Sequence, residues 1–110
     1  MKVGDVVRWT FVQGDGQSKM RPAIVLAAVP PFNDWRVCAV SSQVHREVKG
    51  LDLLVEEGHT DFHLMGLRTT SAIRVAQLTT LPDRSIQGTM GSISGATLVL
   101  LKARLQEWLR

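Results

Sequence analysis

The sequence predicts a mostly β fold, a small antiparallel barrel with one C-terminal helix packed on it. Up to about residue 81, short stretches of apolar residues alternate with polar and glycine- or proline-containing turns. Only the last stretch changes to the residue spacing of a helix. Five to seven short strands followed by one helix are typical of such a barrel.

The first part of the chain predicts three strands. Between residues 3 and 11 the apolar side chains recur mostly at every second position, the pattern of a half-buried strand. Residues 13–19 are polar or glycine and predict a surface loop. The apolar run 23–29 predicts a central strand with Pro22 at its first positions, where a missing N–H is tolerated. A third strand is expected over residues 35–42.

The middle of the chain, residues 43–66, is polar and contains all three histidines. We expect two mobile loops there and one strand over the short apolar run 51–55. Strands are expected again over residues 71–75 and 78–81, before a turn at residues 82–84.

A closing helix is predicted by apolar residues on one helical face, with Ser94 as the N-cap. These residues are Leu98, Leu101, Leu105, Trp108 and Leu109. Their spacing places Trp108 in the core, and the inward phase of the first strand does the same for Trp9. Trp35, beside the turn at residues 30–31, is left open between core packing and base stacking.

Length and composition indicate one globular domain over residues 1–110. No apolar run approaches the roughly 20 residues of a membrane-spanning helix, and no apolar segment follows the first charges, so we expect a cytoplasmic protein without membrane contact. The net charge of +3 and the pI near 9.6 favour a polyanionic partner only weakly. The single cysteine, Cys38, lies in an apolar run and is interpreted as buried filler rather than a nucleophile.

Two functional hypotheses apply to the histidines, a zinc site and a general base. His59 and His63 are four residues apart, but two histidines are too few for a zinc site and their segment lacks helical periodicity. We therefore expect no metal and no cofactor. A general-base role for His63 or His45 remains the minor alternative to solvated loop histidines.

Five sequence blocks resemble the MazF/PemK family, and together they cover nearly the whole chain. They are Gly4-Asp5-Val6-Val7, Arg21-Pro22-Ala23-Ile24-Val25-Leu26, Ala39-Val40-Ser41-Ser42-Gln43, residues 66–74 (GLRTTSAIR) and Gly91-Ser92-Ile93-Ser94. The resemblance implies an SH3-like barrel with a C-terminal helix, assembled as a homodimer. It further implies a toxin paired with a cognate antitoxin, and a metal-independent, sequence-specific endoribonuclease that cleaves single-stranded RNA through attack of a 2′-hydroxyl on its phosphate.

The resemblance also assigns the chemistry to three residues. Arg21 matches the family's loop-end arginine, and its planar fork can bind two phosphate oxygens together. Ser41 stands where the family usually has threonine, so the hydroxyl is retained, although a serine that ends a strand is often only a local cap. Arg74 matches an arginine that some PemK-like members use in proton transfer. Expected RNA contacts are Gln17, Lys19, Ser42, Gln43, Arg68 and Thr70.

Two departures from the family pattern put part of this chemistry in question. An acidic residue two positions after the proton-transfer arginine is replaced by Ala76, and the glutamate of the first loop is replaced by Gly16. Two alternatives therefore stay open: a toxin of the same fold that poisons a protein such as DNA gyrase, and a barrel that binds nucleic acid without cutting it.

Overall fold

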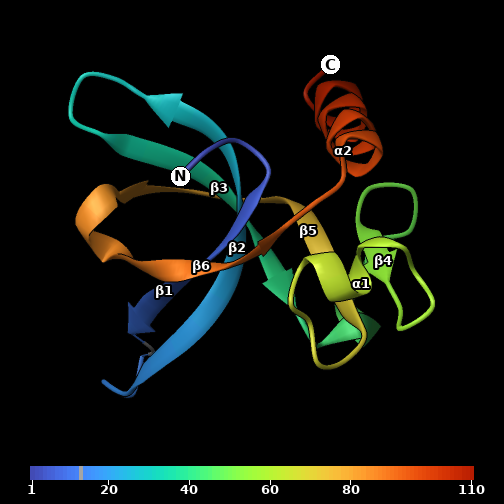
Figure 1. Cartoon of the computed structure of the whole chain (residues 1–110), viewed down its shortest axis with the longest axis horizontal. Coiled ribbons are helices and arrows are strands. Elements are labelled where there is room, and N and C mark those ends of the chain that lie inside the picture. The colour runs from blue at the N-terminus through green and yellow to red at the C-terminus, as the bar shows by residue number, and fades with distance from the viewer. Residues whose placement is uncertain (13) are drawn as a thin grey trace.

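The computed structural model describes residues 1–12 and 14–110 and contains one strongly bent antiparallel sheet with a C-terminal helix (Figure 1). The six strands lie in the order β4-β5-β3-β2-β1-β6, so β4 and β6 form the sheet edges. The strands are β1 (Asp5–Val12), β2 (Ser18–Val29), β3 (Asp34–Ser41), β4 (Leu53–Val55), β5 (Ser71–Pro82) and β6 (Ile86–Ser92). The helices are α1 (Asp61–Leu64) and α2 (Gly95–Trp108), with 3-10 turns at Val44–Arg46 and Asp83–Ser85. The predicted fold class, mostly β with a C-terminal helix, is confirmed.

The second strand begins earlier than the sequence predicts. Residues 18–22 were expected in a loop and at the strand's start, but they continue the β1–β2 hairpin as far as the pair Val12 and Ser18. Pro22 is therefore well inside β2, opposite Arg8. In the described part of this connection, residues 14–17, the Gln17 N–H donates to Asp15 Oδ1 at 3.0 Å. Gln13, which belongs to the predicted loop, lies outside the described residues.

The two strands predicted over residues 71–75 and 78–81 form one bulged strand, β5. On β3, the neighbours Cys38 and Ala39 pair with Leu78 and Arg74, so residues 75–77 bulge out of the ladder. The sequence contains the reason. The inward apolar positions are odd-numbered up to Val75 and shift by one at Leu78, and a bulge restores the inward direction after such a shift.

Two elements, α1 and β6, were not predicted, because both are short and contain or adjoin glycine. Their backbones pack against each other. A Cβ at Gly91 would lie 2.0 Å from the Leu64 carbonyl oxygen, and a Cβ at Gly66 would lie 2.7 Å from that of Met90. Only glycine allows the backbones of β6 and α1 to come so close at Gly91. Because glycine is typical of turns, the sequence of this strand indicates a turn.

The sheet buries side chains on both faces. The larger core contains Ile24, Ile73 and Leu101, with Leu98 and Leu105 of α2 packed against it. A smaller core on the other side consists of Val7, Ala23, Val25, Val37 and Leu81, with Trp9, Trp35 and Ile86 beside it. The prediction that Trp108 is core is wrong: its side chain is 49% exposed. Trp108 lies in the last turn of α2, which extends past the sheet (Figure 1).

The start of α2 is fixed by a cluster that we call the α1–α2 junction, made of Asp61, Ser94 and Thr97. Ser94 is the N-cap, as predicted, and its Oγ accepts from the Thr97 N–H at 3.2 Å. Asp61 is fully buried, and its Oδ2 accepts from the Ser94 N–H at 3.0 Å and from its hydroxyl at 3.2 Å. Burial raises the pKa of Asp61, but the hydrogen bonds from Ser94, one from the Thr97 side chain and the nearby charge of His59 lower it below its ordinary value of 3.8. No helix of the described chain is long and apolar enough to cross a membrane.

Candidate nucleic-acid interface

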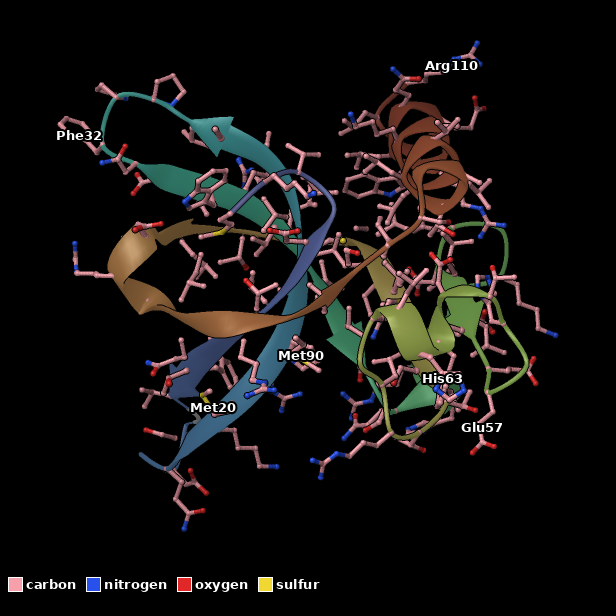
Figure 2. All side chains as sticks on the ribbon, viewed as in Figure 1. Met20, Phe32, Glu57, His63, Met90 and Arg110 are labelled. Atoms are coloured by element: carbon pink, nitrogen blue, oxygen red, sulfur yellow. The ribbon has the colours of Figure 1, made fainter. Side chains whose placement is uncertain are left out.

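Two open pockets lie side by side on the sheet and meet at Arg21, Val40, Ser41 and Gln43. The first pocket has a volume of about 540 Å³, and the second has about 570 Å³. The first is lined by Arg8, Lys19, Met20, Pro22, Ser42, Gly66, Leu67, Arg68, Thr69, Ser71 and Met90 besides the shared residues. The second adds Trp9, Phe11, Ala39, Arg46, Arg74, Ala76, Gln77, Leu78 and Thr79 to them. In Figure 2, Met20 and Met90 lie on the side of the molecule away from Phe32 and Arg110.

Strand register explains why the three predicted catalytic residues come together. Ala23 of β2 pairs with Ala39 of β3, and Ala39 pairs with Arg74 of β5. Arg21 and Ser41 each lie two residues from this row on their strands. Paired residues, and residues two apart on a strand, share a face of the sheet. Arg21, Ser41 and Arg74 therefore project from one face, across three neighbouring strands.

Arg21 is held by an aromatic ring instead of a carboxylate. Its guanidinium carbon lies 5.0 Å from the centroid of the Phe11 ring, a cation–π contact. Its Nε is buried and has no hydrogen-bond partner among the residues that the structure describes. A buried donor left without a partner is rare in folded proteins and calls for a specific explanation. Arg21 thus forms no ion pair with any residue that the structure describes.

The hydroxyl of Ser41 can act both as a local cap at the end of its strand and as a donor to a ligand. Its Oγ accepts from the Gln43 N–H at 3.1 Å, so it does act as a local cap at the end of β3. That bond uses a lone pair and leaves the hydroxyl hydrogen free to donate. Because Ser41 lines both pockets, this donor can reach a ligand in either of them.

Arg74 lines only the second pocket, and it is paired with a residue that sequence reasoning missed. Its Nε donates to Oδ2 of Asp52 at 2.9 Å. Asp52 is 3% exposed and directly precedes β4. A signal was present in the sequence, since Asp52 is the one charged residue within the otherwise apolar run 51–55.

The predicted RNA contacts divide into two groups. Lys19, Ser42, Gln43 and Arg68 line the first pocket, and Gln43 lines the second as well. Gln17 and Thr70 line neither. Gln17 is exposed in the β1–β2 turn, and Thr70 is half-buried between Thr69 and Ser71, which do line the first pocket.

The two pockets together concentrate positive charge. Six of the chain's 13 lysine and arginine residues line them, including Arg8 and Arg46, which sequence reasoning did not select. No aspartate, glutamate or histidine is found among the described lining residues. Cations gathered from separate strands and loops without intervening carboxylates make a site for a polyanion.

Comparison with known proteins agrees with this geometry. The model of the PemK-like, MazF-like toxins of type II toxin-antitoxin systems matches residues 2–109. The chain belongs to this PemK/MazF toxin family. A search of curated proteins gives no match.

Solved structures of MazF toxins share the fold of this PemK/MazF toxin. The MazE–MazF complex from Deinococcus radiodurans has 20% identity and a TM-score of 0.73, with 99% of this chain and 95% of that chain covered. An endoribonuclease in complex with its cognate antitoxin, from a mycobacterial species, has 15% identity and a TM-score of 0.74, with 99% and 94% covered. MazF alone from D. radiodurans has 19% identity and a TM-score of 0.70, with 99% and 96% covered.

Neither the three histidines nor the buried Cys38 of this PemK/MazF toxin are among the described residues that line the two pockets, although His45 lies between Gln43 and Arg46, which do line the second pocket. His59 Nδ1 accepts from the Asp61 N–H at 3.0 Å, and the exposed His63 stacks edge-on against Phe62. Figure 2 shows His63 on the α1 side of the molecule. Cys38 is buried, as predicted, and burial raises its pKa to about 12. A thiol with that pKa stays protonated at neutral pH and does not serve as a nucleophile.

The tryptophans differ from one another in their surroundings. Trp9 packs against the smaller core, as expected, but it also lines the second pocket and contacts Phe11 edge-on at 5.7 Å between ring centroids. Trp35 packs on the same core, and its Nε1 donates to Asp83 Oδ1 at 3.0 Å. Trp9 is thus the tryptophan available to a ligand in the second pocket.

Proposed function

We propose that this PemK/MazF toxin is a metal-independent endoribonuclease that cleaves single-stranded RNA at preferred sequences. The proposal rests on the junction of the two pockets, which Arg21 and Ser41 both line and where the buried Nε of Arg21 has no partner among the described residues. The carboxylate-free row of cations around this junction fits an RNA backbone passing from one pocket into the other.

Cleavage would proceed by attack of the 2′-oxygen on the adjacent phosphorus, with loss of the 5′-oxygen of the next nucleotide. This step forms a 2′,3′-cyclic phosphate and places growing negative charge on the phosphoryl oxygens. Arg21 would meet that charge with its planar fork, and Ser41 would donate its hydroxyl hydrogen to the same phosphate. The 2′-hydroxyl gives up its proton to water, and the leaving 5′-oxygen takes up a proton. Arg74, on the second-pocket side, would donate hydrogen bonds at this proton-transfer end of the reaction while its guanidinium stays protonated.

Single-stranded RNA is favoured over duplex because its bases can leave the stack. Trp9 and Phe11 line the second pocket and offer aromatic surface to an unstacked base, and Gln43 and Gln77 offer amide groups to its edge. In a duplex these base faces are covered by neighbouring base pairs. Sequence preference would follow from which bases fit the two pockets.

The proposed partners are a cognate antitoxin and a second copy of the chain, both in the cytoplasm. An acidic antitoxin segment would find its countercharges in the first pocket, at Arg8, Lys19 and Arg68. The sheet has two edge strands, and Val99 and Leu100 of α2 are 70% and 44% exposed, which favours association of two copies. Light scattering that gives one 12.2 kDa subunit at micromolar concentration would contradict the homodimer.

A barrel that binds RNA without cutting it is the second candidate, and the observation that favours it is Ala76. This small residue lines the second pocket where some family members carry an acidic residue. A toxin of this fold that acts on DNA gyrase is a further alternative. It would not need the row of cations at the pocket junction, which makes it the weaker of the two.

Incubation of purified protein with a long RNA, in the presence of a metal chelator, tests the proposal. The expected result is cleavage at a few defined sites, with cyclic phosphate ends. The matched control is the double variant His59→Ala with His63→Ala, which should cleave like wild type because neither side chain lines the pockets. Intact RNA retarded on a gel would support the binding barrel, and loss of cleavage on addition of chelator would contradict a metal-independent reaction.

A further inference from the structure

The carboxylate of Asp52, beside the second pocket, accepts three hydrogen bonds. Its Oδ2 accepts from the Nε of Arg74 at 2.9 Å and from the Val48 N–H at 3.0 Å, and its Oδ1 accepts from the Val75 N–H at 3.0 Å. Its backbone oxygen also accepts from Arg104 of α2. One residue thus connects the segment after β3, strand β5 and the C-terminal helix.

Two of these bonds fall at the bulge of β5. Residues 75–77 leave the ladder with β3, so the Val75 N–H has no partner on that strand. It donates to the carboxylate of Asp52 instead. Bulges next to active sites turn a side chain away from the direction that a regular strand would give it. Arg74, the last paired residue before this bulge, is also the residue that Asp52 holds.

The bond to Arg74 uses Nε and spares the terminal nitrogens. In the described part of the chain, Nη1 and Nη2 of Arg74 make no hydrogen bond, and the side chain is 17% exposed and lines the second pocket. A guanidinium fixed through Nε presents both terminal nitrogens together, in the geometry that two phosphate oxygens require.

We propose that Asp52 is the positioning residue for Arg74, in a site where Ala76 stands in place of the acidic residue of some family members. The proposal rests on the proposed ribonuclease function and adds a residue to it. Asp52 itself does not touch RNA, because both of its oxygens are occupied and its side chain is 2% exposed. It acts through the direction it gives to Arg74.

The same carboxylate also ties Arg74 to the loop after β3. The Val48 N–H, bonded to Asp52, belongs to the segment that follows Arg46, and Arg46 lines the second pocket with Arg74. Loss of the carboxylate would therefore release two cations of this pocket, Arg74 directly and Arg46 through its loop. The first pocket, with Arg8 and Arg68, would keep its charges.

The test is single-turnover cleavage of a short RNA by Asp52→Asn, with RNA affinity measured separately. Asparagine keeps the volume but offers one acceptor oxygen in place of two. Cleavage of bound RNA should fall by about ten- to a hundredfold, the size of effect that a misplaced group produces, while affinity changes only slightly. The matched control is Asp61→Asn, which removes another buried carboxylate outside both pockets and should leave the cleavage rate of folded protein unchanged.

Two further variants test whether Asp52 acts through Arg74. In an Arg74→Ala background, Asp52→Asn should lose most of its effect and keep only the smaller contribution through the Arg46 loop, and an additional loss as large as in wild type would show that Asp52 does not act through Arg74. If Asp52→Asn does not fold, Arg74→Lys replaces it: this variant keeps the charge but lacks Nε, and wild-type cleavage by it would overturn the proposal.

NMR of the Arg74 Nε–H separates this proposal from the proposed function. In wild type that proton should exchange slowly with water, and in Asp52→Asn it should exchange at the rate of an exposed arginine. If the wild type does not cut RNA but the exchange differs as stated, the ribonuclease assignment fails while Asp52 still positions Arg74. If the two exchange rates are equal, Asp52 does not hold Arg74, whatever the protein does to RNA.

Discussion

The pocket junction and the α1–α2 junction treat buried polar groups in opposite ways. At the α1–α2 junction, Asp61 accepts from the N–H and the hydroxyl of Ser94, and Ser94 in turn caps α2. At the pocket junction, Arg21 keeps a buried Nε without a partner and rests against the ring of Phe11. The first arrangement satisfies its own donors and acceptors, whereas the second leaves one buried donor without a partner among residues 1–12 and 14–110.

This contrast separates residues that stabilise the fold from residues that act on a ligand. Substitutions at the α1–α2 junction should lower the free energy of unfolding and leave the rate of cleavage by folded protein alone. Substitutions at the pocket junction should do the reverse, because an unpartnered cation contributes little to the folded state.

The largest effect is expected for Arg21→Ala. Removal of one preorganised donor from a developing oxyanion typically costs about 3–4 kcal/mol, or roughly a hundred- to a thousandfold in rate. RNA affinity should change little, and Arg21→Lys should restore little because a point charge does not reproduce the fork. Single-turnover cleavage with separate binding measurements checks this. Weaker binding with an unchanged rate of cutting would show that Arg21 only holds the substrate.

The next largest effect is expected at the contact between α1 and β6. Gly91→Ala would place a Cβ 2.0 Å from the Leu64 carbonyl oxygen, so the two backbones must separate, at a cost of about 1–3 kcal/mol in unfolding free energy. Gly95→Ala is the matched control, because open space surrounds that position in the first turn of α2. It should be neutral or slightly stabilising. Equal losses in both variants, measured by denaturant unfolding, would contradict the close approach.

Asp61→Asn should destabilise the protein in a pH-dependent way, by about 1–3 kcal/mol at neutral pH. The hydrogen bonds at the α1–α2 junction lower the pKa of Asp61 in the folded state below its ordinary value of 3.8. A lowered folded-state pKa stabilises the protein above the unfolded-state pKa, and that stabilisation is lost as the pH falls through the folded-state value. The difference between wild type and variant should therefore shrink in acid. A constant difference down to strongly acidic pH would contradict the assignment.

The smallest effect is expected from Ser41→Thr. Threonine keeps the hydroxyl that lines both pockets and that accepts from the Gln43 N–H, so cleavage should stay close to wild type. Ser41→Ala removes the donor and should slow cleavage by about tenfold, roughly the rate equivalent of one hydrogen bond to a charged group. Equal rates for the two variants would show that Ser41 only caps β3.

The sequence predicted the elements whose periodicity is regular and missed those that depend on contacts between distant segments. The alternation in β1 and β3 and the N-cap at Ser94 were sufficient to place those elements. Strand β6 was missed because Gly91 reads as a turn, and its glycine is explained only by Leu64, 27 residues earlier in the chain. The exposure of Trp108 follows from where the sheet ends, which helical spacing does not reveal.

The candidate site shows the same division. Arg21, Ser41 and Arg74 could be selected from sequence blocks, and the register of β2, β3 and β5 places them on one face. Asp52 could not be assigned a role, because its partner Arg74 is 22 residues away and the β5 bulge that brings Val75 to it arises only from a change of phase in the strand. Arg8 and Arg46 were missed because only folding brings them to the pockets.

If the pocket junction cleaves RNA as proposed, the attacking group is the RNA's own 2′-hydroxyl. The most direct measurement uses a short RNA with one cleavage site and its twin with a single 2′-deoxy nucleotide at that site, both in the presence of chelator. We expect equal affinity for the two, cleavage of the RNA to a 2′,3′-cyclic phosphate end, and no cleavage of the deoxy twin. Cleavage of the deoxy twin at a similar rate would contradict this mechanism, because the attacking oxygen would then come from water or from the protein.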